Sequence, residues 1–213
     1  MATPRQSTEA PTLVLASSSP RRQQMLSQLG YQFEVCAPDI EERRCQGESP
    51  QAYVLRLAQQ KAQAGQQQYH ALYAQQSESD NHAHNGVDAV VLGSDTLIAL
   101  GDQVFEKPRD LEHSYQILKQ LSGTVHQVLT AVSVVQGQQH HNVLVTTKVW
   151  FKSLSRQEIE QYWQSGEPCD KAGSYAIQGL GGRFVTHLEG SYHAVVGLPL
   201  YETDQLLHRF LSK

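Results

Sequence analysis

Short apolar runs that lead directly into helix-start signals are the feature that most constrains the fold of this sequence. Residues 12–17 (TLVLAS) have the composition of a short buried strand, and Ser19-Pro20 follows at once. Ser19 suits an N-cap, and Pro20 suits the first helical position because the N–H that proline lacks would have no partner there. Strand and helix signals alternate in this way along the chain, which predicts an α/β protein.

The other expected elements follow from the same kinds of signal. Ser155-Arg156-Gln157-Glu158 has capping-box spacing and begins a helix that runs through Trp163. Residues 126–135 and 142–151 are two β-rich runs around a polar turn, which predicts a hairpin. Further strands are expected at residues 31–37, 88–93 and 184–188, and further helices at residues 20–29, from 49 onward, at 110–121 and at 199–211.

The size and charge of the chain exclude several classes of protein. With 213 residues, 39% of them hydrophobic, the chain can form one sizeable core and needs no second domain. A net charge of -4 opposes the approach of polyanions, so nucleic-acid binding through a broad basic face is not expected. Any anion that the protein binds must therefore be captured by a local cluster of Lys and Arg.

Targeting signals are not apparent in the sequence. No run approaches the roughly 20 apolar residues that cross a bilayer, so no membrane partner is expected. Residues 1–11 form a polar tail that contains Glu9 and lacks the apolar middle of a secretory signal. Cys36, Cys45 and Cys169 form no CxxC motif and cannot all pair, which is typical of reduced thiols in a cytoplasmic protein. Residues 65–88 are rich in Gln, Ser, His and Asn, and we expect them to form a solvated loop or irregular surface insert.

The first candidate site is the run Ser17-Ser18-Ser19-Pro20-Arg21-Arg22. A strand delivers small hydroxyl residues to the start of a helix, where unpaired N–H groups bind anions. Arginine is normally unfavourable at this positive end of a helix, so two arginines there indicate that an anion such as phosphate is bound. The alternative is an ordinary helix cap followed by solvated arginines.

Two shorter motifs carry charge at the ends of apolar segments. Asp95, in Gly93-Ser94-Asp95-Thr96, follows an apolar strand, and the carboxyl ends of strands are where open α/β sheets bind ligands. In Glu106-Lys107-Pro108-Arg109 the proline restrains the backbone beside Lys107. Taken alone, the Asp95 motif is better explained as an ordinary polar turn, and the Lys107 motif is equally consistent with a charged turn before a helix.

The fourth candidate is the run from Asp170 to Gly182 (DKAGSYAIQGLGG). Its four glycines allow the backbone to approach a ligand closely, and Gln178 has the donor and acceptor groups needed to read a base edge. The alternative is a flexible connection. The sequence contains neither a P-loop nor a dinucleotide-binding GxGxxG motif.

Together these segments resemble the Maf family of nucleoside triphosphate pyrophosphatases, first described as septum-formation inhibitors. The matching runs cover nearly all of residues 13–207. They are LASSSPRRQQML, the Glu41-Glu42 pair, RLAQQKA, LGSDT, EKPRD, LSGTVHQVLTAV, DKAGSYAIQGLGG and GSYHAVVGLPL. The family usually has glycine where this chain has Ser18, and residues 65–88 look longer than usual.

The resemblance implies one domain over residues 1–213, in which a mixed sheet flanked by helices forms two lobes around a central cleft, as in ITPase-like proteins. It implies hydrolysis of dTTP and UTP to the monophosphate and pyrophosphate, because Arg21, Thr96 and Gln178 match the branch with that specificity. Asp95 would be the proton acceptor, and Glu42 and Asp95 would bind Mg²⁺ or Mn²⁺. The implied triphosphate contacts are Ser17, Arg21, Arg22, Lys61 and Lys107, while Thr96 and Gln178 would select the base.

Two other expectations remain open at this point. Family members are often dimers, so a homodimer is expected. The main alternative function is a non-enzymatic nucleotide-binding regulator of cell division, which the historical name of the family invites.

Overall fold

A computed structural model describes residues 11–77 and 89–211, and these residues form an α/β fold around one mixed sheet. The strand order is β2-β1-β3-β5-β6-β7, with β4 paired to β3. The strands are β1 Leu13–Leu15, β2 Glu34–Val35, β3 Val90–Leu100, β4 Gln103–Phe105, β5 Val125–Gln136, β6 Gln139–Phe151 and β7 Val185–Glu189. The helices are α1 Pro20–Gln28, α2 Pro50–Ser77, α3 Leu111–Leu121, α4 Arg156–Gln164, α5 Tyr192–Val196 and α6 Leu200–Leu211. The predicted mixed sheet flanked by helices is confirmed.

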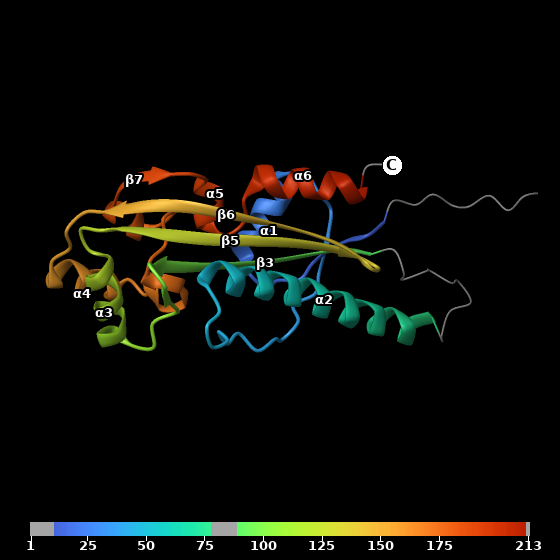
Figure 1. Ribbon diagram of the computed structural model, residues 1–213, viewed down its shortest axis with the longest axis horizontal. Helices are drawn as coiled ribbons and strands as arrows, with labels where there is room; N and C mark the ends of the chain where they lie inside the picture. Colours follow the sequence, from blue (N-terminus) through green and yellow to red (C-terminus); the bar gives the residue numbers. More distant parts are fainter. Residues whose placement is uncertain (1–10, 78–88, 212–213) are drawn as a thin grey trace, which may run out of the picture.

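Helices cover both faces of the sheet (Figure 1). The long helix α2 lies along one face of β3 and β5, while α1 and α6 pack on the opposite face. Alternate residues of β3 serve the two layers, since Val91 contacts the α2 layer and Leu92 contacts the α1 and α6 layer. Helices α3 and α4 lie side by side at one end of the sheet (Figure 1).

Several local predictions are confirmed by the structure. Ser19 caps α1 by accepting a hydrogen bond from the N–H of Arg22, and Pro20 is the first helical residue. Ser155 and Glu158 form both hydrogen bonds of a capping box at the start of α4. The hairpin of β5 and β6 is continuous from Val125 to Phe151 and is longer than the pattern predicted. The hydrogen bonds of these elements join residues that are close in the sequence, so the sequence pattern predicts them.

The expectation that residues 65–88 form an irregular surface insert is wrong for residues 65–77. Helix α2 continues through them to Ser77. Gly65 and Tyr69 are buried on the face of α2 that also carries Ala62, and Gly65 lies directly against Ala16 of the sheet layer. The Gln-rich composition is typical of a solvated loop, but glutamine is a good helix former and one packed face stabilises the helix. The rest of that segment, residues 78–88, lies outside the described residues.

Two other expectations also need correction. Asp95 does not follow a strand; it lies in the middle of β3, because residues beyond it pair with β5 as far as Ala99. The second strand is only Glu34–Val35, where residues 31–37 were expected. Helix α5 was not predicted at all. The two-lobe division of one domain stays a prediction.

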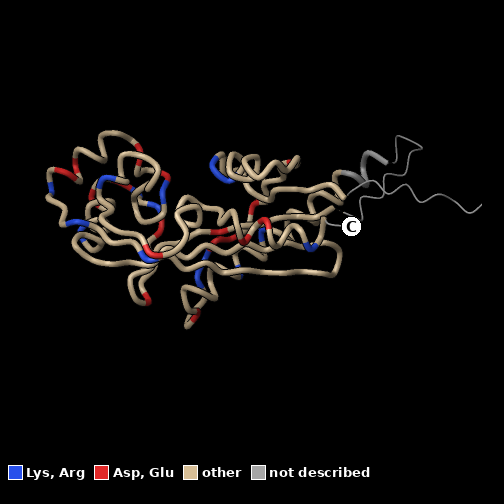
Figure 2. Tube along the Cα trace, turned by 90° about the horizontal axis from the view of Figure 1, so that it is seen from above, with Lys and Arg blue, Asp and Glu red and all other residues tan. Residues whose placement is uncertain are grey.

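Lys and Arg positions lie among Asp and Glu positions in the described part of the fold, and no broad region of one sign stands out there (Figure 2). In the part of the chain that the structure describes, no helix is both long and apolar enough to span a bilayer.

The contact between α2 and β3 at Gly93 leads to a stability prediction. A Cβ at Gly93 would collide with the backbone of α2 at Ala58 and Ala62. We expect Gly93→Ala to lower the free energy of unfolding by about 1–3 kcal/mol, because the helix must move away from the sheet. Denaturant unfolding followed by circular dichroism measures this loss.

Gly101→Ala is the control for that substitution, since a Cβ there meets no atom within 4 Å and only the positive φ of +61° opposes it. A smaller loss for Gly93→Ala than for Gly101→Ala would contradict close packing of α2 on β3.

Candidate active site

A cavity opens where the edge of β3 changes its partner. Along one edge, β5 pairs with β3 from Val91 to Ala99. Along the other edge, β1 pairs as far as Leu92, and β4 begins to pair only at Ile98. Within the described chain, residues 93–97 have no strand partner on that second edge. A cavity of about 590 Å³ lies beside this open stretch.

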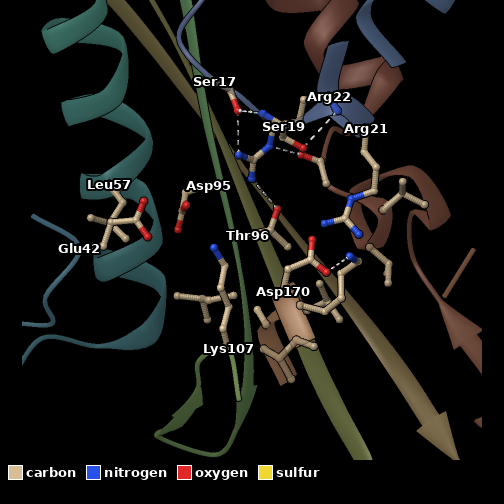
Figure 3. A pocket seen from close by; sticks show the side chains of 18 of the residues that line it. Ser17, Ser19, Arg21, Arg22, Glu42, Leu57, Asp95, Thr96, Lys107 and Asp170 are labelled. Atoms are coloured by element: carbon tan, nitrogen blue, oxygen red, sulfur yellow. Dashed lines mark hydrogen bonds and ion pairs between the residues drawn. The ribbon is translucent and has the colours of Figure 1, made fainter. Parts of the chain in front are cut away.

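All nine residues that the sequence singled out line this cavity. They come from separate elements and loops and are Ser17, Arg21, Arg22, Glu42, Lys61, Asp95, Thr96, Lys107 and Gln178. Figure 3 shows the labelled members of this set directed toward a common space. Their roles toward a ligand stay predictions.

An ion cluster occupies the α2 side of the cavity. Lys61 Nζ, on α2, is 2.6 Å from Asp95 Oδ1 and 2.7 Å from Glu42 Oε1. The Lys61 and Asp95 side chains are only 12% and 11% exposed, whereas that of Glu42 is 51% exposed. Burial alone would raise the pKa of Glu42, but the hydrogen bond from Lys61 and the charges of Lys61, Lys107 and Arg22 bring it below its ordinary value. The Glu42 carboxylate is therefore held in its charged form.

The loop that carries Glu42 is bound both to α2 and to the turn after β3. Arg44 donates to the backbone oxygen of Glu48 and to Asp102, beyond the end of β3, each at 2.7 Å. The Glu48 carboxylate binds Arg56 of α2, and this hydrogen bond is the main reason that its pKa falls to about 2. These contacts limit where Glu42 can lie.

Arg22 has a more internal position than the sequence predicted. Its Nε donates to Gly197 O at 2.9 Å, Nη1 to Ser17 Oγ at 3.4 Å and Nη2 to Thr96 Oγ1 at 3.3 Å. Burial lowers the pKa of Arg22; Asp95 raises it, Arg21 lowers it further and Glu42 raises it. With five N–H donors in a guanidinium, Arg22 retains donors for a ligand while it also holds Ser17 and Thr96 in place.

Arg21 and Lys107 are placed differently from Arg22. Within residues 11–77 and 89–211, no ion pair or hydrogen bond holds either side chain. Both side chains point into the open part of the cavity, and Asp170 lies near Arg21 (Figure 3). Unpaired cations beside a cavity attract an anion, so these two residues are the cations best placed to contact a phosphate.

The glycine-rich run owes its glycines to internal packing, which differs from the expected approach of backbone to ligand. A Cβ at Gly173 would collide with Ile98, one at Gly179 with the Glu167 carboxylate, and one at Gly181 with the Tyr162 hydroxyl. Glu167 accepts hydrogen bonds from the Tyr162 hydroxyl at 2.7 Å, Leu180 N at 2.8 Å and Gly181 N at 2.9 Å. The segment is thus ordered around Glu167, and Gln178 lies exposed at its turn.

Sequence reasoning missed several residues of the site. Tyr53 lines the cavity, and burial, together with the charges of Glu106, Asp95 and Glu42, raises its pKa to about 12. Lys171 also lines it and pairs with Asp170. Asp170 and Lys171 open the run DKAGSYAIQGLGG, and their adjacent opposite charges were the available signal for this pair. Gly197 lies in the run GSYHAVVGLPL, but the run does not show the role of its carbonyl, because the contacts of that carbonyl come from residues far away in the chain.

Comparison with known proteins identifies the family. Residues 12–210 match the family described as "Maf-like protein". The chain belongs to the Maf family. It is 61% identical over 198 residues to the "dTTP/UTP pyrophosphatase" of Vibrio cholerae, which covers 93% of this chain and 97% of the relative. It is 52% identical over 199 residues to the protein of the same name from Salmonella typhimurium, which covers 93% of each chain. The predicted resemblance is confirmed.

The resemblance to the Maf family implies a divalent metal, and the side chains of the cavity include suitable carboxylate ligands for such an ion. No group of three or more His, Cys, Asp or Glu residues that could hold a metal occurs among the described residues. Glu42 and Asp95, however, lie close together, because one carboxylate oxygen of each contacts Lys61 Nζ, at 2.7 and 2.6 Å, and each carboxylate has a second oxygen that could bind a cation beside this ammonium. Mg²⁺ is commonly bound by one or two carboxylates, with water and substrate phosphate as the other ligands. This donor set therefore suits a cation that arrives with a phosphate ligand.

The contacts of Glu167 predict its effect on the site. We expect Glu167→Gln to lower the free energy of unfolding at pH 7 by about 1 kcal/mol, because an amide cannot accept all three hydrogen bonds. Burial alone would raise the Glu167 pKa, but the bonds from Tyr162, Gly181 and Leu180 and the charge of Lys171 leave it below its ordinary 4.5. The contribution is therefore full above pH 4.5 and disappears as the pH falls through the lowered value.

Thermal unfolding of both proteins between pH 3 and pH 7 measures this difference. Glu160→Gln, which removes only a pair with Arg156 on the surface of α4, is the control. A stability difference for Glu167→Gln that grows toward acid pH would contradict the assignment.

Proposed function

We propose that this protein is a nucleoside triphosphate pyrophosphatase that hydrolyses dTTP and UTP to the monophosphate and pyrophosphate. The observation that carries the proposal is the gathering of Asp95 and four cations, Arg21, Arg22, Lys61 and Lys107, around one cavity. Relatives named dTTP/UTP pyrophosphatase, 52–61% identical over more than 90% of the chain, support the choice of reaction. We also propose that the enzyme acts in the cytoplasm and forms a homodimer.

The arrangement of charge suits a polyphosphate substrate. A nucleoside triphosphate carries several negative charges that repel an attacking nucleophile, and positioned cations remove this repulsion. Arg21 and Lys107 are free to contact phosphate oxygens, while Arg22 and Ser17 extend the donor set at the start of α1. The same cations would stabilise the charge that develops on the leaving pyrophosphate.

Asp95 is the proposed proton acceptor for the attacking water. Its Oδ1 is bound by Lys61, and no hydrogen bond to its Oδ2 occurs within the described residues, so Oδ2 can accept a proton. In the proposed reaction the water oxygen bonds to the α-phosphorus as the bond to the bridging oxygen of pyrophosphate breaks. Lys61 would orient the carboxylate during this step.

A bound Mg²⁺ or Mn²⁺ would be held by Glu42 and Asp95, and when bound it would neutralise phosphate charge. Phosphate contacts do not distinguish bases, so selection falls to side chains away from the triphosphate. Thr96 and Gln178 line the cavity and are the proposed base-selecting residues.

A panel of nucleoside triphosphates with Mg²⁺ tests the reaction. We expect dTTP and UTP to give dTMP or UMP plus pyrophosphate, separated by ion-exchange chromatography. Chelation of the metal should reduce turnover by more than ~10²-fold, because loss of the cation removes several kcal/mol of charge stabilisation. Release of orthophosphate and a nucleoside diphosphate would contradict the assigned reaction. Binding without turnover of any nucleotide would favour a regulator.

The role of Asp95 predicts a separation of binding from catalysis. Asp95→Asn should lose turnover by at least ~10²-fold while the protein still folds and binds dTTP, because an amide cannot accept the proton. Single-turnover rates and calorimetric binding measure the two quantities. Asp204→Asn, which changes a carboxylate bound to Tyr31 outside the cavity, is the matched control. Full activity of Asp95→Asn would show that another group accepts the proton.

A further inference from the structure

Thr96 lies at the centre of a short chain of hydrogen bonds that ends deep in the fold. Arg22 Nη2 donates to Thr96 Oγ1 at 3.3 Å, and Thr96 Oγ1 is 3.1 Å from Thr130 Oγ1. Thr130 Oγ1 donates to the backbone oxygen of Ala194, in α5, at 2.7 Å. Thr130 faces Thr96 directly across the β3–β5 ladder, is fully buried and is not part of the cavity wall.

The number of protons available determines which group donates and which accepts in each of these hydrogen bonds. A hydroxyl group has one proton to donate, and a carbonyl oxygen can only accept. Since the Thr130 proton is given to Ala194 O, Thr130 must accept at its contact with Thr96. Thr96 therefore donates its only proton to Thr130 and accepts from Arg22. Toward the cavity, Thr96 offers a lone pair and no proton.

We propose that Thr130 is a positioning residue for base selection, because it keeps Thr96 as a hydrogen-bond acceptor toward the nucleotide. An acceptor complements the N3–H of uracil and thymine, whereas cytosine presents a lone pair at N3. If Thr130 did not hold the proton, the Thr96 hydroxyl could rotate and donate to cytosine. The inference rests on the proposed pyrophosphatase activity and adds a buried residue that acts on specificity through Thr96.

Thr130→Val tests this inference with a side chain of nearly the same shape. The measurement is the ratio of kcat/KM for UTP to that for CTP. We expect this ratio to fall about tenfold, which corresponds to one hydrogen bond gained or lost with an uncharged group. Thr130→Ser retains the hydroxyl and should restore most of the ratio. An equal loss with both nucleotides, or no change in the ratio, would overturn the inference.

A matched control and a double-mutant cycle separate specificity from damage to the fold. Thr203 is also fully buried, in α6, and its hydroxyl has no hydrogen-bond partner within the described residues, so Thr203→Val should leave the ratio within about twofold. In a Thr96→Val background, Thr130→Val should have no further effect on the ratio, because it acts through Thr96. A persisting effect there would show that Thr130 acts through α5 and would overturn the inference.

The two proposals can fail separately. A wild-type protein that releases no pyrophosphate from any nucleotide would contradict the proposed function. An active wild-type protein whose UTP-to-CTP ratio is unaffected by Thr130→Val would overturn only the role of Thr130.

Discussion

The incomplete pairing of β3 is the constraint on which the whole site depends. One edge of this strand is paired with β5 along almost its full length, which holds it rigidly in the sheet. The other edge loses β1 after Leu92 and gains β4 only at Ile98. Backbone groups in a sheet interior need partners, so an open stretch is stable only at a place that solvent or a ligand can reach. The cavity is the space beside that stretch.

The geometry of β3 places the residues of the cavity in two layers, one on each face of the strand. Successive side chains of a strand point to opposite faces, so Asp95 faces α2 and Thr96 faces α1 and α5. The α2 layer supplies Lys61 and thus contains the ion cluster proposed for chemistry. The opposite layer supplies Arg22 and a chain of neutral hydrogen bonds proposed for recognition. The two networks share no hydrogen bond, but the charges of Arg22, Asp95 and Glu42 couple them across the cavity.

Local signals in the sequence were reliable where a short segment determines its own structure. The caps at Ser19 and Ser155 and the β5–β6 hairpin were predicted correctly because their hydrogen bonds join residues close in sequence. The wrong predictions concern residues whose structure depends on contacts with distant parts of the chain. Residues 65–77 look like a polar loop until one face is seen packed against Ala16, and Asp95 looks like a strand end until β5 is seen beside it.

The sequence by itself determined which residue types are available for chemistry and, through family resemblance, which nine positions belong together. Tertiary structure alone decided which contacts each of these residues makes. It places Lys61 between two carboxylates, directs most contacts of Arg22 inward and leaves Arg21 and Lys107 facing the cavity. It also shows the contacts of Thr130 and Gly197, which lie in runs that resemble the family but to which the sequence assigned no role. The physical reason is that these contacts join residues far apart in the chain, and their energies depend on burial and distance, which a linear pattern does not contain.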